Sequence, residues 1–443
     1  MSVIDPGIAA PRPLGPPPSF RDRTARAVAA PAAAAADRLA VALITLDIVL
    51  MVVLQKFAVP LGGDAQVPSL LLAHYAVIGV LLLARRAVID PTRLILYGVF
   101  MLLAVLSQIV PDRSFSVPSL ALTLVTYAPL AAVLPIARAS YRRILLNFQW
   151  IVVGVCLLVF FQHVCQLAGL GMPSLDGLQP EATIYHEYVY LQPLYWSSPY
   201  DKPNAIFLLE ASHTSQMIAM GLLLELALFH RLRFIVLFGC ALVATFAGTG
   251  LLMMLLSVPF LLGRVRPALI AACLLAIPVI LGLAAVTGWF EIVGKRLDEH
   301  ERQDSSSYAR FIAPTQIVID TIEQHDPDTI LFGVGAGNME KRPGVLWLAF
   351  SKVFVEYGFI VFLAWLVFMS WVLFRAPGAW IAAWMVAVQY HLLNGAFLVP
   401  LHVYLCWVLA AGYRLPPPVP VTSAAPARER AKSACQAPAR AFN

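Results

Sequence analysis

The chain has 443 residues, of which 60% are hydrophobic and 13% are charged, and its mean hydropathy is +0.78. Soluble domains are about 25% charged, so this chain has too few charged side chains to cover a core of its size with polar surface. Apolar stretches of about 20 residues, the length of a membrane-spanning helix, recur along it. The composition predicts an integral membrane protein. It excludes soluble enzymes, nucleic-acid-binding proteins and secreted disulfide scaffolds.

The two ends of the chain differ from the part between them. Residues 1–36 are rich in Ala, Pro and Arg and lack the continuous apolar stretch of a signal peptide. Residues 414–443 have a similar composition. We expect both to be disordered tails, and residues 37–413 to form one polytopic transmembrane domain.

Hydropathy predicts an all-α fold with about twelve transmembrane helices. Their expected ranges are 38–56, 68–85, 93–110, 117–136, 144–168, 206–229, 232–247, 249–263, 267–288, 346–374, 379–394 and 397–413. The seventh and eighth ranges join directly at Ala247-Gly248-Thr249-Gly250, so a tight re-entrant pair is the alternative for them.

The positions of Lys and Arg predict the orientation. With both termini in the cytoplasm, 21 of the 31 Lys and Arg residues lie on the cytoplasmic side, where the connections are short. Two long external segments then remain, residues 169–205 and 289–345. The first is dense in aromatic residues, which suit either sugar binding or anchoring at the membrane interface. The second holds most of the external basic residues, and we expect function in these two segments.

Within the second segment, an apolar rhythm of i, i+3 and i+4 begins at Tyr308 and predicts a helix at the membrane interface. Arg310 lies off its apolar stripe. A guanidinium can donate two parallel hydrogen bonds to a phosphate, so Arg310, and Arg296 earlier in the segment, are candidate phosphate ligands. The alternative is that both arginines contact lipid headgroups or a nearby carboxylate.

The run Gly333-Val334-Gly335-Ala336-Gly337-Asn338 follows this helix. Glycines at such spacing bind phosphate when they join a strand to a helix and a Lys-Ser/Thr pair follows, and here none follows. The run therefore predicts a tight turn that leads into the next span.

The sixth span opens with polar residues, among which Glu210 and His213 are one helical turn apart. Ionisable side chains at a membrane boundary are costly unless they have a function or a partner. A carboxylate and an imidazole are the usual general bases, so both are candidate catalytic residues. The alternative is a structural pair that holds two helices together, and this is the interpretation we favour for Lys352 and Glu356. Asp47 is isolated in the first span and has no assigned role.

No set of His, Cys, Asp and Glu recurs at the spacing of metal ligands, and no nucleophile motif is present, so we expect neither a metal nor a cofactor.

Several segments resemble one family when they are taken in order. They are FLLEASHTSQ, TFAGTGLLMMLL, SSSYARF, LFGVGAGNM and FSKVFVEYGFIVFLAW, between about residues 200 and 375. Together they resemble the bacterial O-antigen polymerase/ligase superfamily, especially its exopolysaccharide polymerases.

The resemblance implies a fold of the GT-C type and a metal-independent glycosyl transfer at the periplasmic face of the bacterial inner membrane. The donor would be an oligosaccharide on polyprenyl diphosphate, with membrane lipid and other polysaccharide export and chain-length proteins as further partners and no nucleic acid. By position, Arg310 and then Arg296 would hold the diphosphate, and Glu210 or His213 would supply the base.

Two alternatives remain beside a polymerase. The ligase branch of the family has a His-Asn pair about eleven residues before the glycine that Gly358 matches, and Trp347 stands near that place here, which disfavours an O-antigen ligase. A secondary transporter or flippase would place polar residues near the midplane. In this sequence they gather at the outer boundary and in the external segments, which disfavours transport.

Overall fold

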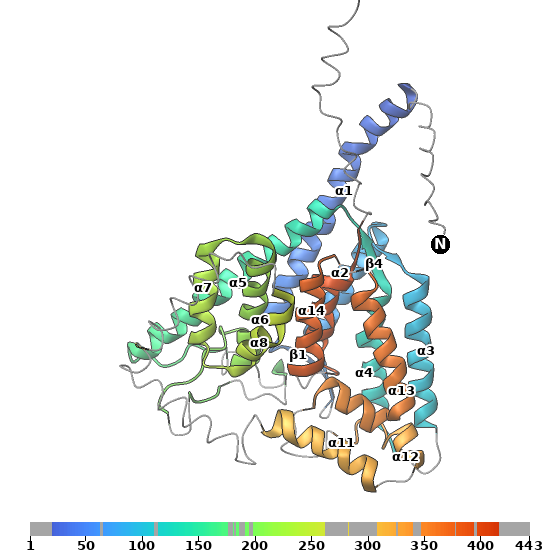
Figure 1. Ribbon diagram of the computed structural model, residues 1–443, viewed down its shortest axis with the longest axis vertical. Helices are drawn as coiled ribbons and strands as arrows, with labels where there is room; N and C mark the ends of the chain where they lie inside the picture. The colour runs from blue at the N-terminus through green and yellow to red at the C-terminus, as the bar shows by residue number, and fades with distance from the viewer. Residues whose placement is uncertain are drawn as a thin grey trace, which may run out of the picture.

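The computed structural model describes residues 20–62, 65–109, 114–175, 180, 183–185, 191–194, 198–261, 282, 308–324, 327–339, 347–376, 378–393 and 397–415. The described chain is mostly helical, and its short strands lie at the two ends of the helical bundle (Figure 1). The helices of the first half are α1 Phe20–Val53, α2 Ser69–Leu83, α3 Pro91–Gln108, α4 Val117–Tyr127 and α5 Arg138–Leu167.

The second half begins with the apolar helices α6 Ala211–Leu224, α7 Leu232–Ala244 and α8 Gly248–Leu261. It continues with α11 Ala313–Gln324, α12 Pro327–Phe332, α13 Ala349–Phe374, α14 Trp380–Val388 and α15 Pro400–Cys406. Single π-helical turns extend or precede four of these helices: η3 Glu225–Phe229, η5 Tyr308–Ile312, η6 Gln389–Leu393 and η7 Trp407–Ala411.

The predicted membrane spans coincide with these helices. Every predicted range overlaps a helix except 267–288, of which only residue 282 lies within the described part of the chain. Among the described helices, α3, α5 and α13 are long and apolar enough to cross a membrane, and several others are apolar but shorter. The mostly helical fold is therefore confirmed and is consistent with a membrane protein, whereas the number of twelve spans and the GT-C arrangement stay predictions. Helix α1 begins at Phe20, inside the segment predicted as a tail.

The helices form two groups with α2 and α14 between them (Figure 1). One group contains α5, α6, α7 and α8, and the other contains α3, α4, α12 and α13. Helix α6 is enclosed along its whole length, because every one of its residues is buried. A helix that is apolar and buried on all sides belongs to the interior of a bundle, and the polar residues at the start of α6 are thus carried into the core.

One end of the bundle holds the short connections that we predict to be cytoplasmic. There β3 Val88–Ile89, β4 Ala132–Pro135 and β5 Tyr413–Arg414 form a small sheet in the order β3-β4-β5. The buried guanidinium of Arg93 donates a hydrogen bond to the carbonyl of Ala411 at 2.8 Å. Asp37 of α1 accepts the hydroxyl of Ser140 at the start of α5. The N-terminal part of α1 and β5, the last described strand, therefore lie at the same end of the bundle.

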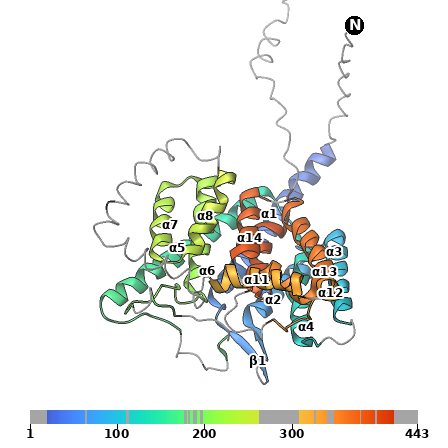
Figure 2. The same cartoon turned by 60° about the horizontal axis from the view of Figure 1, so that its bottom comes forward.

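The opposite end holds the segments that we predict to be external. Helices α11 and α12 lie across it, and the hairpin of β1 Ala58–Gly62 and β2 Ala65–Pro68 lies beside them (Figure 2). Which side of the membrane each end faces stays a prediction.

The predicted glycine turn is confirmed at this second end. Gly333, Gly335 and Gly337 have φ values of 81°, 103° and 75°, in the left-handed region that favours glycine. Gly358 has φ 82° and interrupts α13. The turn pairs with this interruption, since Val334 N–H donates to Val355 O at 2.8 Å and Gly335 N–H to Glu356 O at 3.0 Å. A Cβ at Gly333 would lie 2.3 Å from the Glu356 carbonyl oxygen, so only glycine permits the contact.

Two of the polar pairs inside the bundle involve residues that the sequence analysis considered. Lys352 Nζ is 3.4 Å from Glu356 Oε1, and both side chains are buried. Asp47 is not isolated, contrary to our expectation: its Oδ2 lies 2.7 Å from Nδ1 of His74, and neither side chain is exposed. The His74 ring also stacks on Tyr404 with centroids 3.7 Å apart. Burial of such groups in pairs reduces the cost of removing them from water.

Candidate functional site

The candidate site is built around the start of α6, which the chain reaches through a strained turn. Ala205 and Ile206 have φ values of 51° and 65°, although neither is glycine. The buried side chain of Asn204 holds this turn, because its Oδ1 accepts from Ile206 N–H at 3.1 Å and from Gln162 Nε2 at 3.0 Å. Non-glycine residues persist in this conformation only where surrounding contacts enforce it, often at functional sites.

Glu210 is the N-cap of α6 rather than a residue of its first turn. Its backbone is extended, with φ −144° and ψ 162°. Its buried carboxylate accepts the hydroxyl of Ser212 at 2.7 Å. The predicted helical spacing between Glu210 and His213 is therefore interrupted, because only His213 lies within the helix.

His213 lies against a second histidine that the sequence analysis missed. Nε2 of His213 is 3.0 Å from Nε2 of His402 on α15. The two rings stack with centroids 4.9 Å apart and planes 20° apart. Two ring nitrogens at this distance share one hydrogen, so one imidazole donates and the other accepts. His402 is fully buried. The signal that could have identified it is a lone ionisable residue within an apolar span.

His213 also lines a small pocket with room for one group of about the size of a water molecule. The lining comes from α1 and the turn after it, the segment before α6 and α6 itself, η6 and α15. It comprises Met51, Gln55, Leu208, His213, Met217, Gln389, Leu401 and Leu405. Gln55 is already engaged, since its Nε2 donates to Met51 O at 2.8 Å and its Oε1 accepts from Leu209 N–H at 3.3 Å. Gln389 is 2% exposed, and its Oε1 has no hydrogen-bond partner among the described residues.

The two motifs FLLEASHTSQ and TFAGTG contact each other in space. Thr249 donates its hydroxyl to Ser212 O at 3.2 Å, and Gly250 N–H donates to the hydroxyl oxygen of Ser215 at 3.1 Å. A Cβ at Gly250 would lie 2.5 Å from Ser215 O, so glycine lets α8 approach α6 closely. The start of α8 thus holds the first turn of α6, which carries His213, in place.

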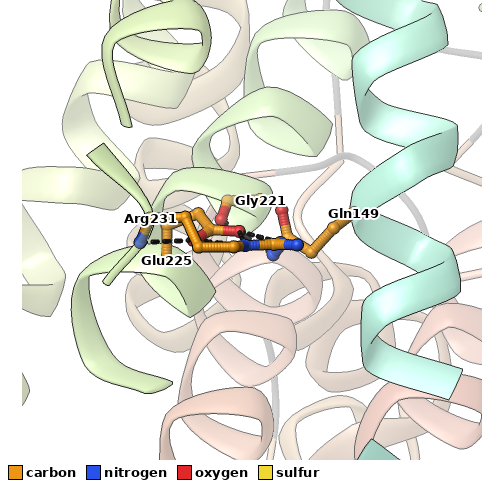
Figure 3. A network of polar contacts seen from close by, with 4 residues as sticks. All are labelled: Gln149, Gly221, Glu225 and Arg231. Carbon is orange, nitrogen blue, oxygen red and sulfur yellow. Dashed lines mark hydrogen bonds and ion pairs between the residues drawn. The ribbon is translucent and has the colours of Figure 1, made fainter. Parts of the chain in front are cut away.

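The other end of α6 is anchored by a separate polar network (Figure 3). Glu225 is fully buried and accepts from Arg231 through both the Nε, at 3.1 Å, and the backbone N–H. Gln149 of α5 donates to the carbonyl of Gly221 at 3.0 Å. These residues do not line the pocket. They fix the helix that carries the site.

The candidate phosphate ligands are described only in part. The predicted helix is confirmed, because the chain from Tyr308 through α11 to Gln324 is helical and Arg310 lies in its first turn, η5. The side chain of Arg310 and the whole of Arg296 lie outside the described residues. Apolar residues Ile312, Ile319 and Ile322 are exposed on this helix. In the described part of the chain no three potential metal ligands converge, and metal independence stays a prediction.

Comparison with known protein families gives a match over most of the chain. A family model described as WcaD colanic acid polymerase matches residues 42–342, a range that includes α6, α8 and α11. No curated protein matches the chain. The matched range covers more than half of the chain, which therefore belongs to the WcaD colanic acid polymerase family.

Proposed function

We propose that this protein joins oligosaccharide repeat units, each carried on polyprenyl diphosphate, into a growing exopolysaccharide or O-antigen chain at the periplasmic face of the bacterial inner membrane. Family membership supports a polymerase of polysaccharide repeat units, and hence a glycosyltransferase-type reaction. The apolar helices support a membrane location. The lipid carrier, the face of the membrane and the cytoplasmic position of both termini belong to the proposal.

In the proposed reaction, a hydroxyl of one lipid-linked unit attacks the anomeric carbon of another chain, and the diphosphate leaves. Arg310 and Arg296 would hold the diphosphate and neutralise the charge that develops on it, which is the electrostatic contribution expected to matter most. Glu210 and His213 are the candidate bases for the attacking hydroxyl. No step in this scheme requires a metal ion or a cofactor.

The observation that carries the proposal is the combination of the family match with the surroundings of His213. The match identifies the class of reaction. His213 gives this reaction a base beside a pocket, at the start of a helix whose position is fixed at both ends.

A deletion strain tests the proposal through the size distribution of its cell glycans, measured by gel electrophoresis and mass spectrometry. A polymerase predicts single repeat units that accumulate on the lipid carrier and an absence of long polymer, with long polymer restored by the wild-type gene. Long polymer that remains on its carrier and does not reach a final acceptor would instead indicate a ligase. Unchanged glycans would contradict the proposal and favour a transporter.

A further inference from the structure

The carboxylate of Glu210 does not cap the helix that it precedes. An N-cap side chain normally accepts from a backbone N–H in the first turn of its helix. Within the described first turn of α6, residues 211–214, no N–H donates to the side chain of Glu210. Oε2 of Glu210 instead accepts the hydroxyl of Ser212 at 2.7 Å. Helix capping therefore does not explain why a carboxylate is buried at this position.

The hydroxyl of Ser212 meets Glu210 because neighbouring hydroxyls hold the backbone of both residues. The carbonyl of Ser212 accepts the hydroxyl of Ser215 at 2.9 Å and that of Thr249, from α8, at 3.2 Å. The carbonyl of Glu210 accepts the hydroxyl of Thr214 at 3.2 Å. Three hydroxyls thus fix the backbone of this turn, and a fourth, that of Ser212, fixes the direction of the carboxylate.

This arrangement suits a base for a sugar hydroxyl. A hydroxyl that donates to a carboxylate forms one of the stronger hydrogen bonds in proteins, so it restricts the side chain of Glu210. A carboxylate has about four acceptor positions, so the bond from Ser212 is compatible with a further bond from a substrate hydroxyl. Fixed geometry of the base relative to the attacking group is a large part of what an enzyme contributes to such a step.

The first turn of α6 also keeps a small contact with the surface. Glu210 is 5% exposed and Ser212 is 7% exposed, whereas residues 214–216, which follow in α6, are not exposed at all. The chain enters this turn from the segment 169–205 that we predict to be external. A substrate at that end therefore meets this turn before residues 214–216. The small pocket beside His213 is not involved, since its described lining includes neither Glu210 nor Ser212.

We propose that Ser212 is a positioning residue for the reaction, because its hydroxyl holds the carboxylate of Glu210 in the direction in which it takes the proton of the attacking hydroxyl. This inference rests on the proposed function, and of its two candidate bases it selects Glu210. The acceptor O–H bond breaks and its proton passes to the carboxylate of Glu210. The oxygen forms the new bond to the anomeric carbon, and the bond from that carbon to the diphosphate breaks with its electron pair on the leaving group.

The test measures polymer formation by the purified full-length protein in proteoliposomes that contain polyprenyl diphosphate-linked repeat units. Rates are expressed per amount of protein that elutes as a folded monodisperse species. The variants are Ser212→Ala, Ser212→Thr, Glu210→Gln and the double variant Ser212→Ala/Glu210→Gln. Ser257→Ala is the matched control, because Ser257 is a buried serine of α8 whose hydroxyl donates to the carbonyl of Met253 at 2.8 Å.

We expect Glu210→Gln to lower kcat by about 100-fold or more, as the loss of a general base does. Ser212→Ala should lower kcat by about tenfold and leave KM unchanged, because a hydrogen bond to a charged group is lost. Ser212→Thr keeps a hydroxyl and should recover most of this loss. Ser257→Ala should keep the wild-type rate per folded molecule.

The double variant separates positioning of the base from support of the fold. If Ser212 acts through the carboxylate, adding Ser212→Ala to Glu210→Gln should change the rate by less than about twofold. An equal loss from Ser212→Ala in both backgrounds would mean that Ser212 stabilises only the start of α6, and would overturn the inference. A wild-type rate in Ser212→Ala or in Glu210→Gln would overturn it as well.

The same assay distinguishes failure of the inference from failure of the proposed function. If the wild-type protein forms no polymer, the proposed function is wrong and the inference with it. If the wild-type protein forms polymer and the variants behave as in the overturning outcomes, only the inference is wrong. Should Ser212→Ala not fold, Ser212→Cys replaces it, because a thiol is close to a hydroxyl in size but is a weak donor, and the same outcomes decide.

Discussion

At the residue scale, Arg310 is the most direct test of donor binding. We expect Arg310→Ala to abolish long polymer in cells while the amount of protein in the membrane stays unchanged, because a phosphate loses its bidentate partner. Arg310→Lys should restore polymer only in part, since an ammonium keeps the positive charge but cannot donate two parallel hydrogen bonds to a phosphate. Complementation of the deletion strain, with immunoblots of the membrane fraction, measures both quantities.

The matched control for Arg310 is Arg143→Ala, an exposed arginine near the start of α5 at the opposite end of the bundle. It should leave the polymer unchanged. Normal polymer from Arg310→Ala would remove this residue from the proposed site.

The pair Lys352 and Glu356 should act on stability rather than on chemistry. Both side chains are buried, so Lys352→Met removes the cation beside a carboxylate that water does not reach. Loss of one partner of a buried pair costs about 3–5 kcal/mol, whereas replacement of both by neutral residues costs much less. We therefore expect a lower unfolding temperature in detergent for Lys352→Met, and recovery in the double variant Lys352→Met/Glu356→Gln.

Activity separates this structural role from a catalytic one. The double variant should form polymer at the wild-type rate per folded molecule. A folded double variant without activity would place Glu356 in the reaction instead.

At this scale, the sequence predicted candidate residues only where polar side chains lie close together along the chain. His213 was predicted because polar residues cluster locally at the start of an apolar span. Its partner His402 is 189 residues away, and His74 is 27 residues from Asp47, so neither contact follows from local spacing. Such pairs depend on which helices become neighbours. The prediction that Asp47 is isolated failed for this reason.

At the element scale, the interruption of α13 at Gly358 and the turn at Gly333 depend on each other. A Cβ at Gly358 would lie 2.3 Å from Leu331 O, and a Cβ at Gly333 the same distance from Glu356 O. Both residues also have a positive φ. We expect Gly358→Ala and Gly333→Ala each to lower the unfolding temperature and to detach the turn from α13.

Hydrogen exchange of the peptide that contains Val334 and Gly335 measures this detachment, because both N–H groups donate to α13. Gly98→Ala in α3 is the control, since a Cβ there meets nothing within 4 Å. Unchanged exchange in Gly358→Ala would show that the turn does not need the interruption.

Elements with a regular pattern of apolar residues or glycines were predicted correctly, but the residues at which they start were predicted less accurately. The apolar rhythm predicted the helix from Tyr308 to Gln324, and the glycine spacing predicted the turn after it. The start of α6 was placed at residue 206, five residues too early, because Phe207, Leu208 and Leu209 are as apolar as the helix itself. Tertiary contacts of Asn204 and Gln55 hold this segment in an extended or left-handed conformation.

At the scale of the whole molecule, the two ends of the bundle separate the segments as the distribution of basic residues predicts. Short basic connections gather at the end that holds the β3-β4-β5 sheet, and α11 lies across the other end (Figures 1 and 2). A reaction on lipid-linked sugars at the periplasmic face requires the end with α11, and hence Arg310, to face outward. The direction of insertion is therefore the property on which the rest of the proposed mechanism depends.

Single cysteines test this direction in a variant that lacks the native cysteines. Glu323→Cys on α11 and Ala139→Cys near the start of α5 place exposed thiols at opposite ends. In spheroplasts, a membrane-impermeant maleimide should label the first variant at once and the second only after the membrane is permeabilised. The reverse pattern would place Arg310 in the cytoplasm and exclude periplasmic polymerisation. Asp37 of α1 accepts a hydrogen bond from Ser140, and β5 pairs with β4 just before α5. The label at Ala139→Cys therefore shows on which side of the membrane α1 and β5 begin and end the described chain.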